Sequence, residues 1–364
     1  MIHLFLLGAA THSVVVWSQH FADAMLRTAP RRRTVERIEA RLVVLNAGVV
    51  LVVAGVVSGV WLVTLAGAVG AGAVAIWHAA LLVRQMRSAL PARFAATVWF
   101  YVAASSLLPF GLALGLALAR SGEDEMHERL HVAHVIVNLC GWVGLAVLGT
   151  LITLWPTILG ARIVQAAATR ATKALPLLIA GVVVAASGAL VGQRLLVSVG
   201  LACYLVGMFQ VARGAVESAR SRPPASYSAL SIGAGLVWWA GCLVTVAVYT
   251  ASASDWSSVA DLLDSVAPYL VAGFVVQVLL GALSFLIPVA LGGGPTCARA
   301  SHRELARAGS VRVVAINVGL AVCALPVAAT VRLAAAAIVL AAFASFLALV
   351  VSAIVAWRRA RKSL

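Results

Sequence analysis

Long apolar segments recur along the whole chain and limit what it can fold into. About 20 consecutive apolar residues cross the hydrocarbon core of a bilayer as one helix. The sequence contains eleven such segments, near residues 2–25, 42–59, 61–83, 94–119, 130–158, 175–192, 195–213, 227–250, 265–291, 311–327 and 330–356. The chain is 63% hydrophobic and 11% charged, against about 25% charged in soluble domains. We therefore predict an all-α, polytopic transmembrane helix bundle of about eleven spans, a single integral-membrane domain over residues 1–364.

The distribution of basic residues predicts the orientation. All but four of the 27 Lys and Arg residues lie in alternate loops, and the exceptions are Arg120, Arg129, Arg194 and Arg332. One such loop, between the ninth and tenth spans, holds Arg299, His302, Arg303, Arg307 and Arg312. Cytoplasmic loops carry this excess, so we predict an N-out, C-in topology.

The same distribution identifies the surroundings of the protein. A net charge of +15 that lies in loops between spans argues against nucleic-acid binding and makes the lipid bilayer the expected partner. All basic residues except Lys173 and Lys362 are Arg, which indicates a GC-rich bacterial genome. The expected location is therefore the bacterial plasma membrane.

A weak internal similarity suggests repeats of four helices. The segments GTLITLWP at 149–156 and GALSFLIP at 281–288 share Gly-x-Leu-x-x-Leu-x-Pro and end the fifth and ninth spans. Repeats of this kind would make spans one, five and nine equivalent, whereas chance similarity in Leu- and Ala-rich sequence is the alternative. An N-out helix that begins at residue 2 also suggests a twelfth span before it.

Polar side chains gather on one stripe of the fifth span. At about 100° per residue, one set of residues falls within about 80° of arc: His127, His131, His134, Asn138, Trp142 and Gly149. The predicted topology places the first three at the outer surface, level with His3. Because the bilayer penalises polar groups that lack partners, the stripe is a candidate binding site.

The spacing of the histidines favours a metal or cofactor. His131 and His134 are three residues apart and present both imidazoles to one side of a helix. Neutral imidazole is a common ligand of haem iron and copper. The candidate cofactor-binding residues are His3, His131, His134 and Asn138, and the candidate metal ligands are His131, His134 and His12.

Two considerations limit this assignment. His3 and His12 are nine residues apart, on opposite faces of a regular helix. His3 can therefore join an outer site only where the helix start departs from regular geometry. Alternatively, these histidines only form hydrogen bonds to neighbouring helices.

The stripe also carries a family resemblance. The pattern His131-x-x-His134-x-x-x-Asn138, continuing to Gly149 and Pro156, resembles a group of actinobacterial membrane proteins. Members of that group are sometimes fused to cupredoxin domains of the copper nitrite reductase or multicopper oxidase type. Segments 3–8, 17–23 and 279–295 are similar to the same group, so the resemblance covers most of the chain.

The group is in turn distantly similar to haem–copper oxidase subunit I and NnrS-like proteins. These have twelve helices and bind haem and copper, and in subunit I the ligands lie on the second, sixth and tenth helices, in approximate threefold symmetry. The resemblance implies haem and/or copper near the outer face, for electron transfer or copper/nitrogen-oxide metabolism. It also implies a separate cupredoxin-type or quinol redox partner.

Departures from that family restrict the expected activity. The sixth and ninth spans contain no histidine, and no Tyr lies on the His131/His134 stripe. We therefore do not expect a complete oxidase, and enzymatic activity stays an open question with the expectation against it. The alternative function is that of a cofactor-free transporter or structural membrane protein.

Overall fold

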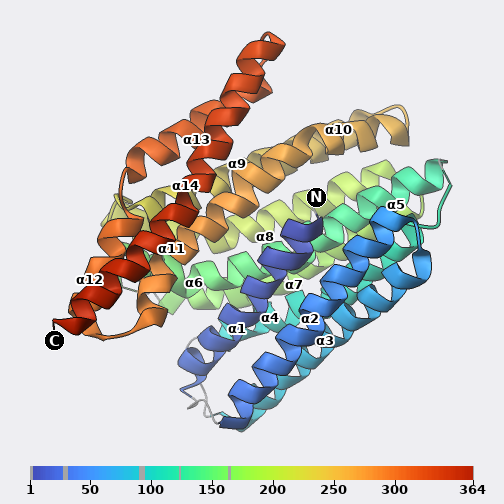
Figure 1. Cartoon of the computed structure of the whole chain (residues 1–364). Helices are drawn as coiled ribbons and strands as arrows, with labels where there is room; N and C mark the ends of the chain where they lie inside the picture. Colours follow the sequence, from blue (N-terminus) through green and yellow to red (C-terminus); the bar gives the residue numbers. More distant parts are fainter. Residues whose placement is uncertain (1–2, 28–31, 90–94, 123, 163–164, 364) are drawn as a thin grey trace. The chain divides into compact units, whose positions relative to one another are not determined.

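The computed structural model describes residues 3–27, 32–89, 95–122, 124–162 and 165–363, and every regular element in them is a helix (Figure 1). The chain divides into two compact units, residues 1–221 with 243–265 and residues 222–242 with 266–364. Each unit is described by itself below. The predicted all-α bundle is confirmed.

The helices follow one another through short connections, and three of them (η1 to η3) are π-helical. In chain order they are η1 (Leu4–Ala10), α1 (Thr11–Leu26), α2 (Arg32–Ser58), α3 (Trp61–Ser88), α4 (Ala95–Leu118), α5 (Glu125–Ile136), η2 (Val137–Gly144), α6 (Leu145–Leu159), α7 (Gln165–Leu190), α8 (Arg194–Ser221), α9 (Tyr227–Ser252), α10 (Trp256–Pro268), η3 (Tyr269–Val276), α11 (Gln277–Leu291), α12 (Gly294–Leu305), α13 (Gly309–Ala324) and α14 (Ala329–Lys362).

The number of spans agrees with the sequence-based prediction. Within the described residues, ten helical segments are long and apolar enough to cross a membrane. The continuous helix formed by η1 and α1 is not among these ten, and it carries the polar residues His12, Gln19 and His20. Counting it gives the eleven predicted spans. The chain is therefore a polytopic helical membrane protein.

The loop predicted between the ninth and tenth spans is wrong, because this segment forms α12 and the start of α13. Cys297, Ser301 and Leu305, four residues apart, are buried, and the Ser301 hydroxyl donates to the main-chain oxygen of Ala353 in α14 at 3.1 Å. The burial of this face and the hydrogen bond to α14 thus stabilise α12 despite its arginines. His302 lies in this helix, and Arg312 lies inside α13.

The π-helical segments support the predicted four-helix repeat. They occur in spans one, five and nine, and both bounds of η3 (Tyr269 and Val276) exceed those of η2 (Val137 and Gly144) by 132. The helices that follow, α6 and α11, are both 15 residues long and both end at a glycine with φ of 65°. Since π-helices are rare, their equal spacing argues against chance similarity.

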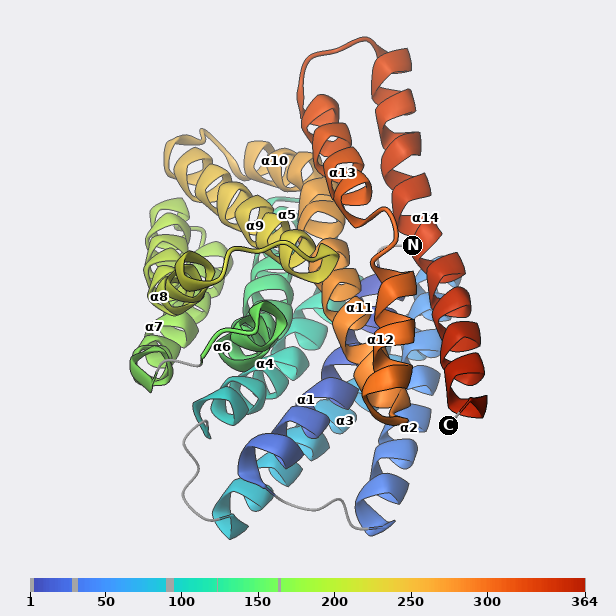
Figure 2. The ribbon, with the colours of Figure 1, turned by 90° about the vertical axis from the view of Figure 1, so that its left-hand side faces the viewer.

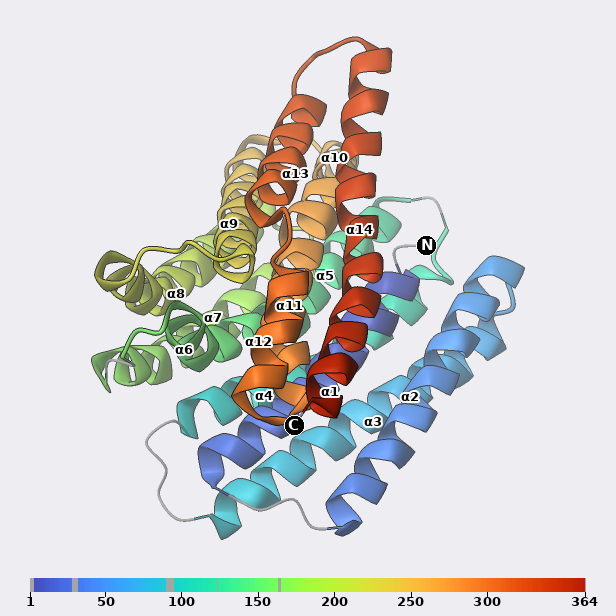
Figure 3. The same cartoon turned by 60° about the vertical axis from the view of Figure 1, so that its left-hand side comes forward.

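A matching repeat links the first part of the chain to the second. The helices α3 and α8 are both 28 residues long, and their bounds differ by 133. Figure 2 shows α7 beside α8, and Figure 3 shows α2 beside α3. The two pairs approach closely at glycines that are also 133 residues apart. A Cβ on Gly67 would lie 2.5 Å from the oxygen of Gly48, and one on Gly200 would lie 2.7 Å from that of Gly181.

Candidate functional site

His134 and Asn138 lie against helix α4. Nδ1 of His134 is 2.9 Å from the main-chain oxygen of Gly111, and Nδ2 of Asn138 donates to the main-chain oxygen of His134 at 2.8 Å. A carbonyl oxygen can only accept, so Nδ1 of His134 carries the proton and Nε2 keeps its lone pair. This is the tautomer in which a histidine anchored by a carbonyl presents Nε2 to a metal.

Two glycines of α4 make room for this polar pair. A Cβ on Gly115 would lie 2.8 Å from Cε1 of His134, and one on Gly111 would lie 2.3 Å from Oδ1 of Asn138. The polar stripe predicted from the sequence did not include these glycines. Their signal is a four-residue spacing within an apolar span, which lets a neighbouring helix with larger side chains pack closely.

The remainder of the predicted stripe does not line one pocket. Gly149 contacts Phe100 of α4, whereas Nε1 of Trp142 donates to the hydroxyl of Thr11 in α1 at 3.0 Å. Asn138 and Trp142 lie in the π-helical segment η2, where the 100° spacing of an α-helix does not hold. The polar face of the fifth span is therefore divided between two neighbouring helices.

His3 and His134, two of the predicted cofactor-binding residues, come together from different helices. Their ring centroids are 6.1 Å apart and the rings are tilted by 44°. His3 immediately precedes the π-helical η1 and is exposed, which fits the condition that the helix start departs from regular geometry. Two imidazole nitrogens that bind one ion lie about 4 Å apart, at about 2 Å each from the ion. A separation of 6.1 Å between the ring centroids is compatible with that distance.

The predicted ligand His131 and the nearby His127 have separate partners. Nε2 of His131 lies 3.9 Å from Oδ1 of Asp264 in α10, and Nδ1 of His127 lies 2.9 Å from the hydroxyl of Ser121. In the part of the chain that the structure describes, no three or more His, Cys, Asp or Glu side chains are grouped to hold a metal ion. His12, His131 and His134 are thus not assembled into one ligand set.

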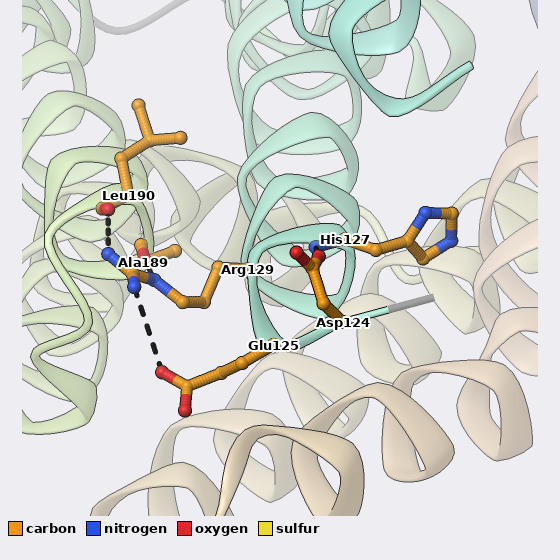
Figure 4. A network of polar contacts seen from close by, with 6 residues as sticks. All are labelled: Asp124, Glu125, His127, Arg129, Ala189 and Leu190. Carbon is orange, nitrogen blue, oxygen red and sulfur yellow. Dashed lines mark hydrogen bonds and ion pairs between the residues drawn. The ribbon is translucent and has the colours of Figure 1, made fainter. Parts of the chain in front are cut away.

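Arg129, an exception to the predicted charge bias, stabilises the end of a helix. Figure 4 shows its guanidinium reaching the last turn of α7, where Nε donates to the main-chain oxygen of Ala189 at 3.0 Å and Nη2 donates to that of Leu190. The opposite edge lies 3.6 Å from Glu125. The last carbonyl groups of a helix lack partners within the helix. Arg129 therefore has a structural role at the predicted outer end.

A second polar cluster lies among α1, α2 and α3. The Arg41 side chain is fully buried (0% exposed), and its Nη1 is 2.5 Å from Nδ1 of His78. Because arginine can only donate, Nδ1 of His78 accepts, and Nε2 donates to the hydroxyl of Ser18 at 2.7 Å. The sequence pattern did not connect these residues, because they come from three different helices.

Two amides join this cluster to a carboxylate. Nη2 of Arg41 donates to Oε1 of Gln19 at 3.3 Å. Oδ1 of Asp23 accepts from the side-chain amides of Gln19 at 3.0 Å and Gln85 at 2.7 Å. The positive charge of Arg41 is thereby linked to the negative charge of Asp23 through Gln19, and burial of the arginine is partly compensated.

The internal repeat shows that packing alone does not require this cluster. The residues 133 positions after Ser18, Gln19, Asp23, Arg41, His78 and Gln85 are Leu151, Ile152, Pro156, Ala174, Val211 and Ser218. All of these except Ala174 line a small cavity of about 10 Å³, and Ala174 is fully buried. The second repeat thus builds the corresponding corner almost entirely from apolar side chains. Intramembrane charges that the fold does not need mark a second candidate site.

No family model, curated protein or solved structure matches the chain. The two candidate sites therefore rest on the contacts given above. They belong to an all-α, polytopic membrane protein.

Proposed function

We propose that this chain is an integral membrane protein that binds copper between His3 and His134 near its outer face. The observation that carries the proposal is the convergence of two imidazoles from different helices, with centroids 6.1 Å apart. Imidazole is a suitable ligand for copper. The contact of Nδ1 of His134 with the Gly111 oxygen corresponds to the outer hydrogen bond that orients ligating histidines.

Each residue of the site has a separate role in this proposal. His3 and His134 are the ligands, and Asn138 holds the backbone of His134 through its 2.8 Å hydrogen bond. His131, with Asp264 nearby, lies one turn of helix before His134. We assign no catalytic residue. The biological role is electron transfer or copper/nitrogen-oxide metabolism at a bacterial plasma membrane, with a cupredoxin-type or quinol redox partner.

Haem is the other group that the family resemblance implies, and two histidines can also ligate haem iron. A haem needs a slot for its macrocycle as well as ligands. The His134 ring is packed against α4, where even one added carbon at Gly115 would lie 2.8 Å from it. We therefore favour a bare copper ion, and absorption spectra separate the two forms of the proposal.

Metal analysis of the full-length protein tests this function. The chain would be purified in mild detergent, loaded with Cu(I) and assayed for copper by elemental analysis and for haem by its Soret band. We expect His3→Ala and His134→Ala to lower copper affinity at least about tenfold. The control His302→Ala, in α12, should bind like the wild type. Wild-type protein with neither copper nor a Soret band would rule the proposal out.

A cofactor-free transporter or structural protein is the second candidate. It is favoured by the protein partners of the outer histidines, since His127, His131 and His134 lie near Ser121, Asp264 and Gly111 respectively. Such contacts are how polar groups join helices within a membrane. Under this alternative, His134→Ala lowers the unfolding temperature while the wild type and the variant show equal, negligible copper binding.

A further inference from the structure

Arg312 is a buried cation near the start of α13. Its side chain is 6% exposed, and its guanidinium carbon lies 4.0 Å from the centre of the Tyr227 ring. Nη1 donates to the main-chain oxygen of Leu305 at 3.2 Å. Tyr227 therefore contacts the flat face of the guanidinium, and the Leu305 oxygen accepts from Nη1. All three residues belong to the second unit.

The other edge of the guanidinium is formed by Nε and Nη2. Among the described residues, Nε and Nη2 of Arg312 are buried and have no hydrogen-bond partner. These two nitrogens form the fork with which arginine binds two oxygens of a phosphate or carboxylate. Leaving a buried charge uncompensated is strongly unfavourable, so this edge is suited to an oxyanion that the chain itself does not supply.

The surroundings of Arg312 indicate a lipid as the source of that oxyanion. On α13, the exposed side chains of Val311, Val314 and Val318 form an apolar strip. This helix belongs to the segment Gly294–Ala324, which is long and apolar enough to span a membrane. Arg307, just after α12, is paired with Glu304 at 3.1 Å, whereas α12 itself exposes Arg299 and Arg303. These are basic residues on the predicted cytoplasmic side, where such clusters attract anionic lipids.

We propose that Nε and Nη2 of Arg312 bind the phosphate of an anionic phospholipid from the cytoplasmic leaflet, which reaches these buried nitrogens when the side chains that cover them move aside. The acyl chains lie along Val311, Val314 and Val318, and the exposed α12 arginines attract the net negative headgroup. The first turn of α13, which contains Arg312, adds the partial positive charge of a helix N-terminus. This site is independent of the copper proposal, because it uses different residues in the other unit.

Native mass spectrometry of the full chain tests the site. The protein in mild detergent would be titrated with phosphatidylglycerol or phosphatidylcholine, for wild type, Arg312→Met and Arg312→Lys. We expect at least about a tenfold weaker first phosphatidylglycerol adduct in Arg312→Met, because a charge-assisted bidentate contact is lost. Arg312→Lys, which keeps the charge without the fork, should also bind more weakly than the wild type. The wild type should prefer phosphatidylglycerol to phosphatidylcholine.

Two controls separate specific binding at Arg312 from general electrostatic attraction of anionic lipid to basic residues. Arg359→Ala/Arg361→Ala, at the exposed end of α14, should leave the first adduct unchanged. Inorganic phosphate at millimolar concentration should not displace it. Equal lipid binding by wild type and Arg312→Met, or an equal loss in the α14 variant, would overturn the proposal. So would full displacement by inorganic phosphate, which would identify a site for free phosphate instead. Lipid-free unfolding temperatures check that each variant is folded.

Discussion

Nδ1 of His134 lies 2.9 Å from the main-chain oxygen of Gly111, across the interface between α5 and α4. This contact fixes the imidazole against α4 and leaves Nε2 available as an acceptor. It depends on the absence of side chains at Gly111 and Gly115, which face Asn138 and His134. The candidate copper site is therefore supported by a helix that itself contributes no predicted ligand.

Adding one methyl group at Gly115 should disturb the site and the fold together. In Gly115→Ala the new Cβ would lie 2.8 Å from Cε1 of His134, so the ring or the helix must move. We expect a loss of about 1–3 kcal/mol in the free energy of unfolding, measured by chemical denaturation in detergent. The control is Gly241→Ala in α9, where a Cβ meets nothing within 4 Å; it should stabilise by about 0.5–1 kcal/mol. Equal effects of the two substitutions would contradict the described packing.

Replacing Arg41 alone should destabilise the protein more than replacing Arg41, His78 and Asp23 together. Arg41→Ala removes the donor to Nδ1 of His78 and to Oε1 of Gln19, together with the positive charge near the Asp23 carboxylate. Removing one partner of a buried charge pair costs about 3–5 kcal/mol. The triple variant Arg41→Ala/His78→Val/Asp23→Asn takes Ala and Val from the second repeat and neutralises the carboxylate. We expect it to recover most of the lost stability in the same denaturation assay. A triple variant less stable than the single one would refute this account.

Arg129→Ala should loosen the end of α7. The substitution removes hydrogen bonds to the Ala189 and Leu190 oxygens, and hydrogen bonds from a charged group contribute about 1.5–3 kcal/mol. Hydrogen–deuterium exchange should become faster over residues 186–192, while exchange in α3 stays unchanged. Arg194→Ala removes the same charge at the start of α8 and serves as the matched control. Equally fast exchange at the end of α7 in both variants would point to a general charge effect.

Asp255 should make stability depend on pH only under acidic conditions. Hydrogen bonds to this carboxyl hold its pKa well below the ordinary value of 3.8. They come first from the hydroxyl of Ser254, then from the main chain and hydroxyl of Ser258, and then from the hydroxyl of Ser257. A lowered pKa in the folded state gives stabilisation that is complete above the ordinary value and is lost as pH falls. The difference in unfolding temperature between wild type and Asp255→Asn should therefore be equal at pH 7 and pH 5 and smaller at pH 3. A difference that grows at pH 3 would reverse the sign of this argument.

Local sequence patterns were sufficient for the membrane spans and suggested their repetition. Apolar length and the placement of arginine predicted eleven spans, because each helix must satisfy its own backbone within the bilayer. The shared pattern at Gly149 and Gly281 predicted a four-helix period, which the spacing of η2 and η3 supports. Helix α12 was missed because its contacts to α14, such as that of Ser301 with Ala353, lie far away in sequence.

The sequence by itself determined the class of protein, the number of membrane spans and the histidines worth testing. The tertiary structure decided which polar groups meet. It placed His3 opposite His134, gave His131 a separate neighbour in Asp264, and joined Arg41 to His78. The physical reason is that helical periodicity specifies the face on which a side chain lies, whereas the partner of that face depends on how helices pack. That packing is determined by close contacts such as those at Gly111 and Gly115, between residues distant in the chain.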